Sequence, residues 1–260
     1  AQSADFYLLV LHHYDAESQL LNAGAGALAD FGGVDRFATV VSNLRAEAQT
    51  FPAGCDSGSV LITSGDNFLA GPEFSASLDA GVPFFDTIAF DLIGYDAFAI
   101  GNHEFDFGPD VLEDFIAGFS TNPAPFLSAN LDFSGEPGLQ TLVDSGRIAS
   151  STVIDVATSG GSTVRVGIVG ATTPNLPFIS SPRDVIVNDI LPAVQDEVDA
   201  LTADGVGIIL LTSHLQGLTP ELDLVSSLRD VDAIIGGGGD EQLANPGALL
   251  IPGAEPSVVH

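Results

Sequence analysis

The sequence contains no lysine, no methionine and no tryptophan, and it has one cysteine. Without lysine, the chain can neither form the phosphate-binding lysine contact of a P-loop nor make a Schiff base with a substrate. Because Cys55 is the single cysteine, no disulfide can form within the chain. Long apolar runs are also missing, and none approaches the roughly 20 residues that a membrane-spanning helix requires. We therefore expect no transmembrane segment.

Positive charge is scarce as well. Six arginines stand against 35 acidic residues, which gives a formal net charge of −29. Binding of duplex nucleic acid is not expected, because it requires clustered lysine and arginine. The excess carboxylates either keep the protein soluble in a salty or divalent-rich medium, or some of them hold cations. Together with the lack of an initial methionine, this composition leads us to expect a secreted, periplasmic or cell-surface protein.

Apolar periodicity predicts the fold class. Hydrophobic residues make up 45% of the 260 positions, enough for a sizeable core. Strand patterns are predicted at 6–12, 59–63, 97–101, 125–131, 148–156, 164–170, 207–212 and 231–235. Helical patterns are predicted at 34–49, 83–93, 110–119 and 189–202. The alternation predicts an α/β sandwich of β-sheets and helices, formed by residues 1–260 as a single domain.

Polar side chains gather directly after the predicted strands. Ligands of open α/β sheets bind beyond the carboxyl ends of the strands, so these positions are candidates for a site. Taken singly, each is consistent with an ordinary turn, a helix cap or a packed polar residue. Taken together, at five strand ends, they have the composition of a metal site. The residues are Asp15 and Glu17, then Asp66, then Asn102 and His103, then His214, and finally Asp240 and Glu241.

Several of these residues lie in longer motifs. The most specific segment is 94–108, which reads GYDAFAIGNHEFDFG. Supporting segments are LHHYD at 11–15, SGDNF at 64–68, LSANL at 127–131 and VGIVGATTP at 166–174. On these motifs the chain resembles the calcineurin-like metallophosphoesterases, specifically the 5′-nucleotidase branch. The resemblance implies a sandwich of two mixed β-sheets flanked by helices.

The resemblance also implies roles for individual residues. Asp66 would bridge two metal ions, and Asp15 would bind the first of them. Asn102 and His214 would bind the second ion, while His103 would contact the phosphate or protonate the leaving group. Two cations roughly 3.5–4 Å apart activate a water and neutralise phosphoryl oxygens. An imidazole with a pKa near neutrality can supply the proton that the leaving oxygen needs.

Two motifs depart from the family's usual pattern. The first motif is usually Asp-x-His, whereas here Glu17 takes the place of the histidine. The last motif is usually Gly-His-x-His, and its two histidines fall on Gly238 and Asp240. Two of the three lost imidazoles are therefore replaced by carboxylates, which remain capable ligands.

The expected site therefore holds one or two divalent cations. Oxygen-rich ligands favour hard ions such as Ca²⁺, Mg²⁺ or Mn²⁺ over zinc. The second position loses one ligand at Gly238, with Glu241 as a candidate substitute. The expected first set is Asp15, Glu17, Asp66 and Asp240, and the expected second set is Asp66, Asn102 and His214.

Arg183 is the remaining candidate. It either clamps a phosphate oxygen of the substrate or forms a surface salt bridge. Our leading hypothesis is a secreted, metal-dependent phosphoesterase acting on nucleotides or other small organic phosphates. The alternative is a non-catalytic extracellular structural or binding module derived from the same fold. We expect the chain to lack the final strands of the catalytic domain and the separate C-terminal nucleotide-binding domain of the family. The oligomeric state stays open.

Overall fold

The computed structural model describes residues 6–26, 29, 31–50 and 55–239, and the backbone of two short strands, β12 (Leu243–Ala244) and β13 (Val258–Val259). The candidate ligands Asp240 and Glu241 lie outside the described residues. Among the helices of the described part, none is both long and apolar enough to cross a membrane.

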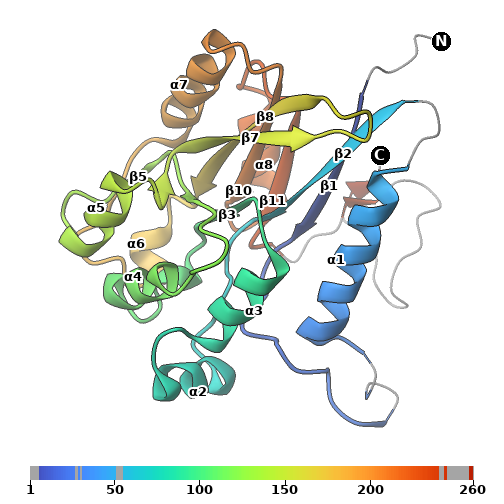
Figure 1. Ribbon diagram of the computed structural model, residues 1–260. Helices are drawn as coiled ribbons and strands as arrows, with labels where there is room; N and C mark the ends of the chain where they lie inside the picture. The colour runs from blue at the N-terminus through green and yellow to red at the C-terminus, as the bar shows by residue number, and fades with distance from the viewer. Residues whose placement is uncertain are drawn as a thin grey trace.

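Two β-sheets form the centre of the molecule (Figure 1). The first is wholly parallel, in the order β1 (Phe6–His13), β2 (Asp56–Thr63), β3 (Ala97–Ala99), β4 (Phe126–Leu127) and β6 (Ile148–Ala149). The second has the order β11 (Ala233–Gly237), β10 (Ile208–His214), β8 (Thr163–Thr172) and β7 (Ser151–Ala157). In this sheet β7 alone runs antiparallel to its neighbour, β8. A further small pair joins β5 (Leu131–Asp132) to β9 (Ile186–Val187). The predicted α/β sandwich is confirmed.

Helices cover the outside of this sandwich. Helix α1 packs on the strands of the first sheet, and α7 packs on β8 of the second. The predicted helices correspond to α1 (Val34–Ala48), α3 (Phe85–Ile93), α4 (Pro109–Ala117) and α7 (Ile190–Ala203). The sequence patterns missed α2 (Pro72–Ala80), α5 (Pro137–Asp144), α6 (Leu176–Ile179) and α8 (Leu218–Val225). Each of these four is short and buries at most two side chains, so its place in the fold depends mainly on tertiary contacts.

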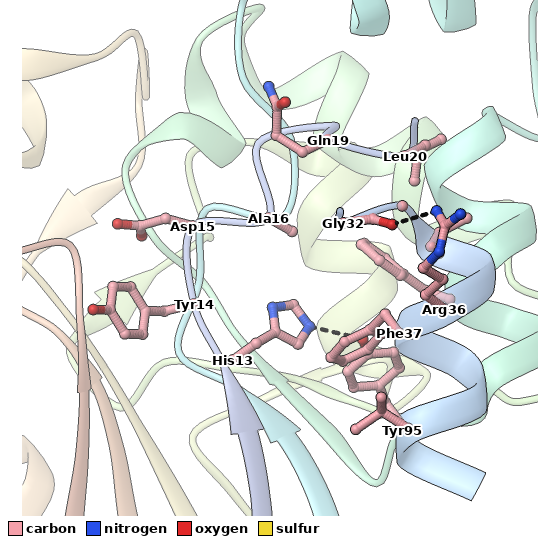
Figure 2. A pocket seen from close by; sticks show the side chains of 14 residues that line it. His13, Tyr14, Asp15, Ala16, Gln19, Leu20, Gly32, Arg36, Phe37 and Tyr95 are labelled. Atoms are coloured by element: carbon pink, nitrogen blue, oxygen red, sulfur yellow. Dashed lines mark hydrogen bonds between the residues drawn. The ribbon is translucent and has the colours of Figure 1, made fainter. Parts of the chain in front are cut away.

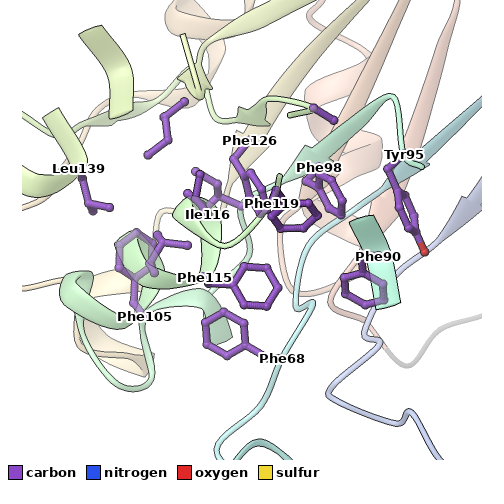
Figure 3. Packing of buried hydrophobic residues seen from close by; sticks show 14 of the residues in the cluster. Phe68, Phe90, Tyr95, Phe98, Phe105, Phe115, Ile116, Phe119, Phe126 and Leu139 are labelled. Carbon is purple, nitrogen blue, oxygen red and sulfur yellow. The ribbon is translucent and has the colours of Figure 1, made fainter. Parts of the chain in front are cut away.

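An aromatic core fills the space between the first sheet and its helices (Figure 3). Phe98 of β3 stacks on Phe126 of β4 with 4.6 Å between ring centroids. Phe68, two residues beyond Asp66, stacks on Phe74 of α2 at 4.3 Å. Offset stacking of buried rings adds to the free energy gained from burying their area. The core therefore anchors the loops that leave the carboxyl ends of β2 and β3.

The two sheets approach each other closely at one edge. A Cβ atom on Gly170 would lie 2.3 Å from the carbonyl carbon of Leu127, so only glycine allows this contact between β8 and β4. Nearby, the Ser64 hydroxyl lies 3.0 Å from the Thr212 hydroxyl and donates to the carbonyl oxygen of Ile235 at 2.9 Å. These bonds join the carboxyl ends of β2, β10 and β11, so the loops that follow the three strands leave the sandwich at the same edge.

Candidate metal centre

The loops after β1 and β2 are tight turns that are hydrogen-bonded to each other. Asp15 and Asp66 both have left-handed backbones, with φ of 51° and 54°. The backbone N–H of Asp15 donates to the carbonyl of Gly65 at 3.2 Å, and that of Glu17 donates to the carbonyl of Asp66 at 3.1 Å. A Cβ on Gly65 would lie 2.8 Å from His214 Nδ1. Strained backbone at a cluster of polar side chains is typical of functional sites.

Three side chains from three strand ends converge at this point. Asp15, Asp66 and His214 each present one ligand atom, and these atoms lie within 4.8 Å of one another. His214 Nε2 lies 2.9 Å from Asp66 Oδ2, and His214 Nδ1 donates to the Ser64 carbonyl oxygen at 2.6 Å. This second bond fixes the imidazole ring and directs Nε2 toward the cluster. Burial is the largest single effect and disfavours the imidazolium. The hydrogen bond to Asp66, the charge of Asp66 and the bond to the Ser64 carbonyl together outweigh it and raise the pKa of His214 to about 9.

The cluster fits a divalent cation. Asp15 Oδ1 is buried and has no hydrogen-bond partner, which is costly for a carboxylate oxygen unless a cation lies beside it. Burial first, and then the charge of Asp66, raise the pKa of Asp15 to about 6. The charge of Glu17 raises that pKa further, so Glu17 lies within electrostatic reach without joining the cluster. Two carboxylates and one imidazole that converge in this way suit hard or borderline divalent metals.

Asn102 and Gln216 extend the cluster on the His214 side. Asn102 is buried, and its Oδ1 lies 3.1 Å from His214 Nε2. The Gln216 side-chain amide donates to the same Oδ1, and its Nε2 lies 3.0 Å from His214 Nε2. The sequence patterns did not single out Gln216, because a polar residue in a loop carries no signal by itself.

The Glu104 side chain joins the loop after β2 to the loop after β3 through hydrogen bonds. Its carboxylate is fully buried and accepts the backbone N–H groups of Asp66 at 3.0 Å and Gly101 at 2.6 Å through Oε2. Through Oε1 it accepts the backbone and side-chain N–H groups of Asn67 at 2.7 and 2.9 Å. Burial raises the pKa of Glu104, against the effect of these bonds. The motifs indicate no role for Glu104, although an acidic residue directly after His103, beyond a buried strand, was an available signal.

His103 lies beside the cluster with its ring partly exposed. Its backbone N–H donates to Asp66 Oδ1 at 2.8 Å, and its Nε2 lies 3.9 Å from Asp66 Oδ2. Its Nδ1 bonds to Asp106 Oδ2 at 2.7 Å, and Asp106 in turn accepts a hydrogen bond from Ser180 at 3.1 Å. The bond to Asp106 is the main reason that the pKa of His103 rises to about 9. At neutral pH the ring is therefore a cation that can hold a phosphoryl oxygen or donate a proton.

The structure does not bring Arg183 to the cluster. Its guanidinium forms two parallel bonds of 2.8 Å to Asp110 and further bonds of 3.2 and 2.8 Å to Glu136. These contacts match the salt-bridge alternative, and a phosphate contact by Arg183 stays a prediction. The roles proposed for Asp240 and Glu241 stay predictions too, because both residues lie outside the described part of the chain.

A cavity of about 430 Å³ lies next to the Asp15 turn, under the N-terminal end of α1. Figure 2 shows His13, Phe37 and Tyr95 on its walls, with the carboxylate of Asp15 pointing away from it. His13 Nε2 bonds to the Tyr95 hydroxyl at 2.7 Å, and burial lowers the pKa of His13 to about 4. The backbone of residues 14–16 therefore separates this largely apolar cavity from the ligand atoms of the cluster.

Comparison with known proteins gives a consistent picture, although no protein-family model matches the chain. The chain is 32% identical to a 5′-nucleotidase of Diplobatis ommata over 242 residues, which cover 91% of the chain and 38% of that protein. It is 31% identical to a 5′-nucleotidase of Mus musculus over 262 aligned positions, covering 97% of the chain and 42% of that protein. The chain thus spans about two-fifths of the length of these curated relatives.

Solved structures agree. A 5′-nucleotidase precursor from Thermus thermophilus superimposes with a TM-score of 0.78 at 30% identity, covering 96% of this chain and 44% of that one. The calcineurin-like phosphoesterase YfkN from Bacillus subtilis superimposes with a TM-score of 0.67 at 21% identity, covering 88% of this chain and 71% of that one. At that identity the second likeness concerns the fold alone.

Proposed function

Because the chain belongs to the 5′-nucleotidase branch of the calcineurin-like metallophosphoesterases, we propose that it is a metal-dependent phosphoesterase that hydrolyses phosphate monoesters. The observation that carries the proposal is the convergence of Asp15, Asp66 and His214 within 4.8 Å, next to the cationic ring of His103. The buried, unpartnered oxygen of Asp15 supports a cation at this point.

The residues present divide the chemical work between them. A bound divalent cation supplies Lewis acidity, which lowers the pKa of a water and neutralises phosphoryl oxygens. Asp15 and Asp66 would hold a first cation, and Asp66, Asn102 and His214 would hold a second. These mostly oxygen donors favour Ca²⁺, Mg²⁺ or Mn²⁺ over zinc. We propose Glu17, whose charge acts on Asp15, as a further ligand, together with Asp240 and Glu241.

His103 would protonate the leaving oxygen or hold a phosphoryl oxygen. Asp106 fixes the ring through Nδ1, so Nε2 carries the proton that can be donated. The bond from the His103 backbone N–H to Asp66 Oδ1 holds the proton donor at the cluster. This arrangement places the general acid by geometry, which contributes typically 10²–10⁴-fold to the rate.

Nucleotides are the substrate class that we favour, because several relatives at 30% identity or more are named 5′-nucleotidases. We also propose that the protein works outside the cytoplasm, as the acidic, lysine-free composition suggests. Comparing hydrolysis of a nucleoside monophosphate with that of a generic aryl phosphate tests the substrate class. Localisation of the natural gene product by cell fractionation tests the export.

Hydrolysis of a generic phosphomonoester tests the activity itself. The purified protein is treated with a chelator, and Ca²⁺, Mg²⁺, Mn²⁺ or Zn²⁺ is then added back singly. We expect a hard cation to restore turnover. The variant His103→Asn should bind the same number of cations and lose on the order of 10²-fold in rate. A folded, cation-loaded protein that hydrolyses no phosphomonoester would instead support a non-catalytic binding or structural module.

A further inference from the structure

Gln216 follows β10 in a conformation that its residue type seldom adopts. Its φ is +63°, in the left-handed region, although it is not a glycine. Its side chain nevertheless turns back toward the cluster, where the amide nitrogen donates to Asn102 Oδ1 and lies 3.0 Å from His214 Nε2. Asn102 Oδ1 and His214 Nε2 are the two atoms at which a second cation would need to bind.

We propose that the Gln216 amide takes the position of the second cation, so that this chain binds one divalent cation tightly and a second only after the amide has moved away. The inference rests on the metal site of the proposed function. An amide nitrogen has no lone pair to offer a cation. Here it donates to Asn102 Oδ1 and lies 3.0 Å from His214 Nε2, so it fills the space between the two atoms that a cation would contact. The two occupants therefore exclude each other.

Gly238 supplies the space that this arrangement needs. A Cβ atom at position 238 would lie 2.5 Å from His214 Nε2 and 2.9 Å from Gln216 Nε2. Any larger side chain there would collide with the glutamine amide in its present position. The missing side chain at 238 and the inward-turned side chain at 216 are thus complementary.

Few contacts fix the Gln216 side-chain amide in its present position. Gln216 is an exposed residue, and its side-chain amide reaches this site through two polar contacts, to Asn102 and to His214. A neutral hydrogen bond adds little net stability, so the open state is a minor but accessible population. Since apparent affinity falls with the fraction of the competent state, the second cation should bind on the order of tenfold more weakly than without the amide.

Calorimetric titration of the chelator-treated protein with Mn²⁺, together with elemental analysis after dialysis, counts the cations. The test variant is Gln216→Gly, because glycine accepts the left-handed backbone without strain. The control is Asp230→Gly, at an exposed position with φ of 58° away from the cluster. We expect one tight cation in the natural protein and in Asp230→Gly. Gln216→Gly should bind a second cation at least about tenfold more tightly than the natural protein does.

A second variant covers the case in which glycine loosens the loop. Gln216→Glu replaces the donor with a carboxylate ligand, and it should also strengthen the second binding event. If both variants bind one cation as the natural protein does, the inference is wrong. It is also wrong if Gln216→Gly loses a cation that the natural protein binds, since Gln216 would then be a ligand. Absence of any cation from all four proteins would refute the metal site of the proposed function itself.

Discussion

Replacing Glu104 with glutamine tests whether one buried carboxylate organises the site. The carboxylate accepts four N–H groups from the two loops that carry Asp66 and Asn102, with two donors on each oxygen. In the variant an NH₂ group replaces one of the oxygens, so two buried N–H groups face a donor in either orientation of the amide. Each buried unsatisfied group costs about 1–3 kcal/mol, which predicts a loss of about 2–6 kcal/mol in the free energy of unfolding.

Urea denaturation of the chelator-treated protein measures this loss, and Mn²⁺ titration measures its effect on the site. We expect weaker cation binding as well, because the bond from the Asp66 backbone N–H to Glu104 fixes the turn that presents the Asp66 carboxylate. Glu47→Gln, at an exposed position of α1, is the matched control and should change neither quantity. If Glu104→Gln unfolds within about 0.5 kcal/mol of the natural protein, the reasoning is refuted.

Three further predictions follow from separate contacts. Asp106→Asn should slow hydrolysis by about tenfold or more with unchanged cation affinity, because it weakens the bond that orients His103; loss of the cation instead would contradict this role. Burial opposes ionisation of Asp91, but hydrogen bonds from three successive backbone N–H groups outweigh it and lower its pKa. The ionised carboxylate therefore stabilises the fold above the unfolded pKa near 4, and this stabilisation is lost as pH falls through the folded pKa. Urea midpoints measured from pH 3 to 7 should drop less at low pH in Asp91→Asn than in the natural protein. Gly170→Ala should destabilise the fold by about 1–3 kcal/mol through overpacking, whereas Gly207→Ala, with nothing within 4 Å, should not; equal thermal midpoints would refute the close approach of the sheets.

Most strands of the sandwich were predictable because each is a short apolar run closed by polar residues. The predictions at 148–156 and 125–131 were wrong in one respect, because each run is divided into two strands that belong to different sheets. Four of the longer helices were predictable from their periodic apolar faces, as in α7 with Val194, Val198 and Leu201 buried. Helix α5 is only eight residues long, so its apolar pattern covers barely two turns and was not recognised as a helix. Such short helices are fixed by tertiary packing, which a local pattern does not contain.

The site divides in the same way. Asp15, Asp66 and His214 follow strand ends, and topology brings strand ends to one edge, so their convergence could be expected from the sequence. The roles of Glu104 and Gln216 could not, because their contacts join residues 37 and 114 positions apart. Arg183 could be picked out from the sequence because basic residues are few. Its partners Asp110 and Glu136, and hence its salt-bridge role, are known only from the fold.

The most direct test of the account compares the natural protein with Asp66→Asn, both after chelation, in parallel assays of Mn²⁺ binding and phosphomonoester hydrolysis. Asp66 belongs to the cluster and also accepts the His103 backbone N–H, so its charge should be needed for both properties. The account predicts that the natural protein binds Mn²⁺ and becomes active with it, and that Asp66→Asn loses binding and turnover together. Hydrolysis by the natural protein that survives full chelation, or an Asp66→Asn variant as active as the natural protein, would contradict the central claim.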